Sequence, residues 1–384
     1  MAGWAPSVSQ STSLRGIDEL ALKTPASRDR YVDFLRAASI AVVVFGHWLS
    51  SLIAFEGGFL SVRNAVGVVP GTWLTTWVLQ VLPVFFFIGG FSSAAALAST
   101  ARRGGTVASY LRSRVVRLLR PIGVFFLVWA AILLALRVSG AAGPQFVRSG
   151  VVLFGPLWFI GIYLIVILIA PLTHRLHARF GLAVPAALAL LAAGLDVLRF
   201  ILNRTAVGWP NFILVWVCVH QLGYFYADGS LLRGGRRLAT ALAATGIVGL
   251  VILTNIGVYP RSMVGTGFER LSNMSPPTVC IQFLTLWLVG GVLLLRGPIS
   301  RWLGRPGPWK TVVFANSIII TVFLWHLPAF VLVFFIARWA GLATPSPGTG
   351  LWWLQRPVLI AASAAVLTPL VFLFARFERP SRQR

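Results

Sequence analysis

The sequence has 384 residues, of which 57% are hydrophobic and only 11% are charged, and its mean hydropathy is +0.83. A soluble domain of this length needs more charge to cover its surface, so this composition excludes an ordinary soluble protein. The net charge of +24 is carried by short basic clusters between apolar runs. These clusters lack stacking aromatics, zinc-ligand spacing or a recognition helix, so we expect no nucleic-acid partner.

Ten apolar runs follow one another along the chain, each long enough to cross a hydrocarbon core of roughly 30 Å as a helix. Backbone groups inside a bilayer must be bonded within their own segment, and the runs lack the alternation of barrel strands. The sequence therefore predicts an all-α polytopic membrane protein with ten transmembrane helices. The predicted spans are residues 31–54, 72–97, 117–136, 150–172, 182–199, 211–227, 238–257, 278–296, 312–336 and 353–375.

The distribution of basic residues predicts the orientation of these spans. With the N-terminus in the cytoplasm, 24 of the 33 Lys and Arg residues fall on the cytoplasmic side. Lys and Arg are retained on that side, so we predict both termini inside and an inner or plasma membrane location. Residues 1–28 are predicted to be a disordered polar tail, 29–376 a single ten-helix membrane domain, and 377–384 a basic C-terminal tail.

The first predicted span contains Asp33, Arg36 and His47. Ionisable side chains in hydrocarbon are costly, so those that a span retains usually have a function. A helix turns 100° and rises 1.5 Å per residue, which places His47 within about 20° of Arg36 and roughly 16 Å further along the same face. Asp33 lies one turn before Arg36, so an ion pair between the two is expected.

Arg36 and His47 together suit a reaction between a phosphate-bearing donor and a hydroxyl. A guanidinium binds phosphate through two parallel hydrogen bonds, and a neutral imidazole can accept a proton from a hydroxyl group. Two alternatives remain open from these residues alone. Arg36 can be an anchor that extends to the membrane interface, and His47 can make a hydrogen bond between helices.

Further motifs occur in a fixed order along the chain. After Asp33-x-x-Arg36 and the ten residues before His47, they are PVFFFIGGF at 83–91, YLRSRVVRLLRP at 110–121, GPLWFIGIYLIVILIAPL at 155–172 and FLWHLPAF at 323–330. In this order the motifs resemble those of the acyltransferase-3 family of membrane acyltransferases, from residue 29 onward. Gly89 stands where the family has the serine of Ser-Gly-Phe, so any role of that hydroxyl is absent.

The resemblance implies ten core helices and transfer of an acyl group to a hydroxyl of a sugar or another polar acceptor. It implies a donor that is commonly acyl-CoA, taken from the cytoplasm as a co-substrate. His47 would be the catalytic base, Arg36 would be required beside it, and Arg117 and Arg120 would belong to the donor region. The chain is expected to be the stand-alone form, with no appended hydrolase-type domain.

The basic run at the start of the third predicted span supports the same donor. Arg114, Arg117 and Arg120 share roughly one helical face, where they can clamp the phosphates of coenzyme A. The alternative is that they fix the topology and bind anionic headgroups of membrane lipids. No bound cofactor and no metal are expected. His174 and His177, predicted to be solvated in a cytoplasmic loop, have no third ligand in sight.

Asp33 is a candidate for lining a substrate cavity, and so are three aromatic or imidazole residues. His326 lies near the middle of the ninth predicted span, where the alternative is a packing hydrogen bond beside Pro328. Trp158 and Tyr163 lie in the family-like fourth span, although most Trp residues in such a chain belong to interfacial belts.

The outer loop at 259–279 holds a further candidate, Asn273, which can line an acceptor site. The local alternative is a helix start in which Ser275 is the N-cap and Pro276 is the first helical residue.

From these observations we predict an integral-membrane O-acyltransferase with His47 as general base. A transporter or flippase for an anionic lipid-linked substrate is the alternative, because buried Arg and His residues also suit that function.

Overall fold

The computed structural model of the protein describes residues 24–25, 28–56, 59–140, 154–155, 157–342 and 344–378. Within these residues, ten helices are long and apolar enough to cross a membrane. The predicted all-α, ten-helix fold is therefore confirmed, and the protein is a multi-pass membrane protein. The ten spans contain α2 (Arg30–Ser50), α4 (Leu82–Arg102), α5 (Val107–Val138), α7 (Trp158–Phe180), α8 (Ala183–Leu202), α9 (Asn211–Ala227), α11 (Gly235–Asn255), α12 (Val279–Trp302), α14 (Ile319–Trp339) and α15 (Gly350–Phe374).

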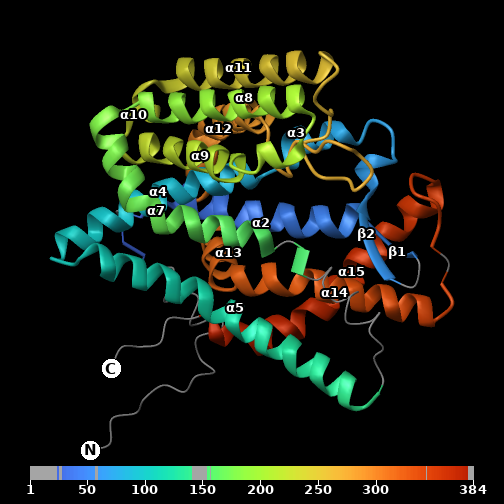
Figure 1. Cartoon of the computed structure of the whole chain (residues 1–384). Coiled ribbons are helices and arrows are strands. Elements are labelled where there is room, and N and C mark those ends of the chain that lie inside the picture. The colour runs from blue at the N-terminus through green and yellow to red at the C-terminus, as the bar shows by residue number, and fades with distance from the viewer. Residues whose placement is uncertain are drawn as a thin grey trace, which may run out of the picture.

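Shorter elements connect these helices. They are β1 (Ser51–Glu56), β2 (Phe59–Asn64), η2 (Ala65–Gly67), α3 (Trp73–Leu79), η4 (Thr205–Gly208), α10 (Ser230–Arg233), α13 (Pro306–Ser317) and η5 (Ala375–Phe377). Helix α2 lies in the middle of the bundle, with α8, α9, α11 and α12 on one side and α13, α14 and α15 on the other (Figure 1). The first span thus packs against helices on both sides, although Phe45 of α2 is exposed.

Helices α4 and α9 approach each other closely at glycines. A Cβ added at Gly90 would lie 2.0 Å from the His220 carbonyl oxygen, and one added at Gly223 would lie 2.1 Å from the Phe87 carbonyl oxygen. Small residues permit such backbone contact between membrane helices. The contact fixes α4, which contributes Phe85 and Ser92 to the cavity described below.

The first span is shorter than predicted. Helix α2 ends at Ser50, because Ser51 adopts an extended backbone and begins an antiparallel hairpin in which Ser51 pairs with Asn64. The prediction that the helix continues to residue 54 was therefore wrong. His47 lies in the last turn of α2, near the end of the helix that is remote from Arg36.

The ninth predicted span, 312–336, is also corrected, because it is divided between two helices. Helix α13 ends at Ser317 and α14 begins at Ile319. Glu378 accepts hydrogen bonds from the backbone N–H groups of Ile320 and Thr321 and from the Thr321 hydroxyl. A carboxylate at this position satisfies donors that the first turn leaves unpaired, which favours a new helix start.

Two other local predictions differ from the structure. Helix α7 continues to Phe180, so His177 lies within it, buried, with its Nε2 3.1 Å from Asp228 Oδ2 rather than solvated in a loop. Helix α12 begins at Val279 with Thr278 as its N-cap, so Ser275 is not the cap.

Candidate active site

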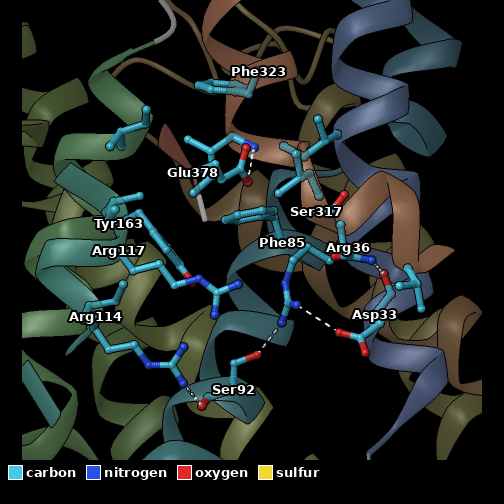
Figure 2. A pocket seen from close by; sticks show the side chains of 18 of the residues that line it. Asp33, Arg36, Phe85, Ser92, Arg114, Arg117, Tyr163, Ser317, Phe323 and Glu378 are labelled. Atoms are coloured by element: carbon cyan, nitrogen blue, oxygen red, sulfur yellow. Dashed lines mark hydrogen bonds and ion pairs between the residues drawn. The ribbon is translucent and has the colours of Figure 1, made fainter. Parts of the chain in front are cut away.

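A cavity of about 460 Å³ lies beside the first half of α2 (Figure 2). One part of its wall is charged and includes Asp33, Arg36, Arg114, Arg117 and Glu378. The remainder is mostly apolar or aromatic. It includes Ile40, Phe85, Phe159, Ile160, Tyr163 and Phe323. The cavity thus combines a polar region that suits an anion with an apolar region that suits a hydrocarbon group.

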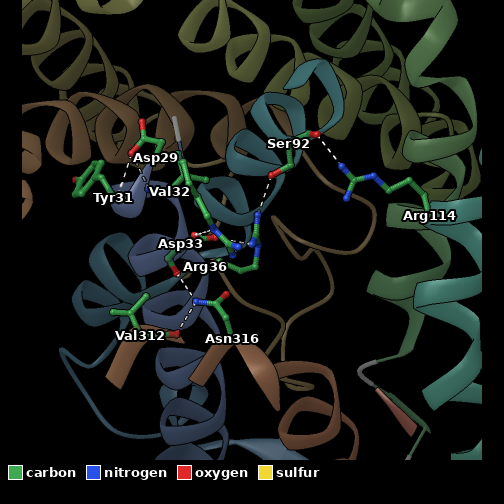
Figure 3. A network of polar contacts seen from close by, with 10 residues as sticks. Asp29, Tyr31, Val32, Asp33, Arg36, Ser92, Arg114, Val312 and Asn316 are labelled. Atoms are coloured by element: carbon green, nitrogen blue, oxygen red, sulfur yellow. Dashed lines mark hydrogen bonds and ion pairs between the residues drawn. The ribbon is translucent and has the colours of Figure 1, made fainter. Parts of the chain in front are cut away.

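Arg36 is held in the charged region by two partners (Figure 3). Its Nη1 lies 3.1 Å from Asp33 Oδ1, which is the i,i+3 ion pair that the spacing predicted. Its Nη2 donates to the Ser92 hydroxyl at 2.8 Å, and Arg114 donates to the Ser92 carbonyl at 2.9 Å. Asp33 also pairs with Arg28. These contacts bring guanidinium groups from α2 and α5 together around one residue of α4.

The cavity brings together two of the three arginines expected from the basic run. Arg114 and Arg117 line it, whereas Arg120 is exposed and is not among its lining residues. With Arg28 and Arg36, four guanidinium groups face two carboxylates, those of Asp33 and Glu378. The wall therefore carries a net positive charge, which favours an anionic ligand.

Glu378 is a cavity residue that the sequence did not reveal. It falls in the segment 377–384, predicted only as a basic tail, yet it is 9% exposed and bonded to the start of α14. Burial raises the pKa of Glu378, although its hydrogen bonds to Ile320 and Thr321 act in the opposite direction. One signal was present: it is an isolated acidic residue directly after the last span.

His47 and His326 meet near the far end of α2. His47 Nδ1 lies 2.8 Å from His326 Nε2, and His326 Nδ1 lies 2.5 Å from the Phe323 carbonyl oxygen. Trp48 Nε1 donates to the His326 carbonyl at 2.9 Å, which adds a second bond between α2 and α14. His326 is 1% exposed, whereas His47 is only partly buried. The accessible imidazole of the pair is therefore that of His47.

Phe323 lies next to both features. Its side chain lines the cavity, and its ring centroid is 5.7 Å from that of His326 and 5.3 Å from that of Phe159. Its carbonyl oxygen is the partner of His326. Phe323 therefore stands between the cavity and the two histidines.

The remaining candidates occupy different places. Tyr163 lines the cavity, while Trp158 is 37% exposed and packs against Phe212 with ring centroids 5.5 Å apart. A Cβ added at Gly89 would lie 3.0 Å from the Tyr163 ring, so the absence of a side chain at Gly89 leaves space for that ring.

Asn273 lies in the outer loop rather than in this cavity. It is fully buried, and its amide nitrogen donates to the carbonyl oxygens of Pro260 and Ser262. Its amide oxygen accepts from the Thr278 hydroxyl at 2.8 Å. These bonds give Asn273 a role in shaping the loop before α12.

Comparison with known proteins adds one match. The family model described as an acyltransferase domain, that of acyltransferase-3 proteins, matches residues 29–376, which is nearly the whole chain. No curated protein and no solved structure matches the chain. The family match favours the acyltransferase hypothesis over a transporter or flippase.

Proposed function

The chain belongs to the acyltransferase-3 family and is a membrane acyltransferase, and from this premise we propose its donor, acceptor and catalytic base. The donor is an acyl-CoA-type thioester, and the acceptor is a hydroxyl of a carbohydrate or another polar molecule. The observation that carries this proposal is the arrangement of α2. One helix places Arg36 in a cationic cavity and His47 near its other end.

The cavity supports an anionic donor with an apolar arm. Arg36, Arg114 and Arg117 can hold phosphate groups through charge-assisted hydrogen bonds, and coenzyme A carries several such groups. The adjoining apolar wall, with Phe85 and Phe159, suits the uncharged part of the donor. Within the described part of the chain, one amino group of Arg36 is paired with Asp33, and the other, which donates to the Ser92 hydroxyl, can exchange that hydroxyl for a phosphate oxygen.

In the proposed reaction, the His47 imidazole removes the proton from the acceptor hydroxyl while that oxygen attacks the thioester carbonyl carbon. A carbon–oxygen bond forms, and the carbon–sulfur bond then breaks. The leaving thiolate takes the proton back from the imidazolium, so the products are the ester and the free thiol. General base catalysis of this kind contributes about 10²–10⁴-fold in rate.

The proposed orientation places both termini and the start of α2 in the cytoplasm of a cell with this protein in its inner or plasma membrane. It is supported by the 24 basic residues that fall on that side. The donor cavity then faces the compartment that contains acyl-CoA, and His47 lies toward the outer face. A hydroxyl acceptor on the outer side would reach His47 without passing the donor.

The first experiment follows free thiol release from acetyl-CoA by the purified protein in detergent, with glucose supplied as the hydroxyl acceptor, for wild type and His47→Gln. We expect release to fall by about 10³-fold in the variant, within the range for loss of a general base. Binding of coenzyme A, measured by calorimetry, should be unchanged, since His47 does not line the cavity. Equal release by both proteins would remove His47 as the base. A wild-type protein that binds no coenzyme A would exclude an acyl-CoA-type donor.

A further inference from the structure

His47 and His326 form a chain of polar contacts that ends at a backbone carbonyl. His326 Nδ1 lies 2.5 Å from the Phe323 carbonyl oxygen. A carbonyl oxygen can only accept a hydrogen bond, so His326 Nδ1 must carry the hydrogen. A neutral imidazole holds one N–H, which leaves His326 Nε2 with a lone pair. The backbone of α14 thereby fixes the tautomer of His326.

The tautomer of His326 in turn fixes that of His47. His47 Nδ1 lies 2.8 Å from His326 Nε2, and this contact needs one donor and one acceptor. Because His326 Nε2 is the acceptor, His47 Nδ1 must be the donor. His47 Nε2 is then the atom without a hydrogen, so it is a proton acceptor. In a histidine, the hydrogen bond made by one ring nitrogen generally determines whether the other ring nitrogen carries a hydrogen.

The relative placement of the rings suits this hydrogen bond. Their centroids are 5.1 Å apart although the two nitrogens are only 2.8 Å apart, so the rings meet edge to edge rather than face to face. Their planes differ by 13°, which directs the N–H of one ring toward the in-plane lone pair of the other. A reversed bond, with His326 Nε2 as donor, would set the His326 Nδ1 lone pair against the Phe323 carbonyl oxygen.

Packing holds the pair in this arrangement. His326 is 1% exposed and Trp48 is 5% exposed, so solvent does not compete for the contacts between them. The indole N–H of Trp48 donates to the His326 carbonyl and ties the neighbouring residue of α2 to α14. Phe323 and Thr321 belong to the same first turns of α14, which Glu378 anchors. These contacts hold α14 at its first turn and at His326 itself.

From this geometry we propose that His326 is a positioning residue, which holds His47 in the Nδ1–H tautomer so that Nε2 is the base. The proposal rests on the acyl transfer proposed above. When His47 Nε2 takes the proton of the acceptor hydroxyl, its Nδ1–H stays bonded to His326, whose lone pair stabilises the new positive charge. His326 keeps its own proton, and His47 returns the added proton to the thiolate.

The direct test is the nitrogen NMR spectrum of the protein labelled with ¹⁵N-histidine, in nanodiscs and without any donor. The sequence has only 5 histidines, and the spectra of His47→Gln and His326→Gln assign the two signals. We expect both imidazoles to be neutral with the hydrogen on Nδ1. A hydrogen on Nε2 of His47 would overturn the proposal. Because no acyl donor is present, this result is independent of whether acyl transfer is the function.

The second test compares two replacements of His326 by thiol release. In His326→Gln the amide oxygen can accept from His47 Nδ1, whereas His326→Leu has no acceptor. We expect kcat to fall by about 10²–10³-fold in the leucine variant and by less than tenfold in the glutamine variant, with the KM for acetyl-CoA within twofold of wild type. His174→Gln, at the opposite end of the bundle, serves as the matched control.

A leucine variant with wild-type kcat would show that His47 does not depend on His326. An equal loss in the leucine and glutamine variants would assign His326 a packing role instead. Coenzyme A binding by each variant reports whether its donor cavity is folded, and the NMR test requires no His326 variant to be active.

Discussion

Arg36 and His47 lie on the same face of α2, yet their surroundings have little in common. Arg36 is surrounded by charges and lines a cavity with Asp33, Arg114 and Arg117. The His47 ring contacts the His326 ring through nitrogens 2.8 Å apart, and the adjacent Trp48 is buried. One end of the helix thus favours an anionic ligand. The other end holds the His47 imidazole in the proposed Nδ1–H tautomer.

Because of this difference, we expect the two ends of α2 to contribute to different steps, one to donor binding and the other to proton transfer. In the proposed reaction, charge attraction at the Arg36 end acts on the anionic donor before and during acyl transfer, so it contributes chiefly to binding. The tautomer at the His47 end matters only when a proton moves, so it contributes to kcat. Substitutions at the two ends should therefore alter different kinetic constants, and each prediction below tests that separation.

Of the three substitutions considered next, the largest effect is expected for Arg36→Gln. Loss of a charge-assisted hydrogen bond costs roughly 1.5–3 kcal/mol, so the Kd for coenzyme A should rise by about 10–100-fold. Calorimetry at low and high salt measures this change, which should shrink as salt screens the charges. The control is Arg112→Gln, an exposed arginine of the same basic run that does not line the cavity. An unchanged Kd in Arg36→Gln would contradict the role of the Arg36 end of α2 in donor binding.

Phe323→Ala tests the boundary between the two ends. Removing the ring opens the wall between the cavity and His326 while the carbonyl that binds His326 Nδ1 remains. We expect the ratio of kcat/KM for hexanoyl-CoA to that for acetyl-CoA to rise by about tenfold, since added methylene groups gain about 1–3 kcal/mol where space exists. The exposed Phe372→Ala is the matched control. A ratio that does not change would place the acyl group elsewhere.

Glu378→Gln is expected to have the smallest effect. This effect is a change in how the Tm depends on pH. Burial raises the pKa of Glu378 above its usual 4.5, so the folded protein retains this proton where the unfolded chain has lost it. Stability therefore falls as the pH rises from 4.5 toward the raised value. The variant has no proton to lose there, so its Tm relative to wild type should increase by about 1–3 °C between pH 4.5 and 7.

Thermal unfolding in detergent, followed by tryptophan fluorescence, measures this difference. A Tm difference that stays constant across the pH range would show that Glu378 is not held in the folded protein as described. Coenzyme A binding by the same variant shows whether the charge balance of the cavity changes independently of stability.

The sequence predicted the ten helices because long apolar runs allow few other structures in a membrane. It also predicted the Asp33–Arg36 pair, since both residues lie on one helix with known geometry. The hairpin after α2 was missed because Leu52 and Ile53 extend the apolar run, although Gly57 and Gly58 in the sequence favour a turn.

Contacts between helices that are far apart in the chain could not be predicted from the sequence. His47 and His326 are 279 positions apart, and their contact depends on how α2 packs against α14. The break at Ile318 was missed for the same reason. It depends on Glu378, a residue after the last span whose carboxylate binds the first turn of α14. A helical pattern specifies which residues share a face, but not which face of another helix it will meet.

Because α2 is a continuous helix, it holds Arg36 and His47 at a fixed separation. The 21-residue helix contains no proline, so the separation between Arg36 and His47 is set by the helical rise alone. One inserted residue would lengthen the separation by about 1.5 Å but would rotate His47 by about 100°, away from His326. Only insertions of whole turns preserve both partners. The distance between these two side chains can therefore change only in steps of about 5.4 Å without turning His47 away from His326.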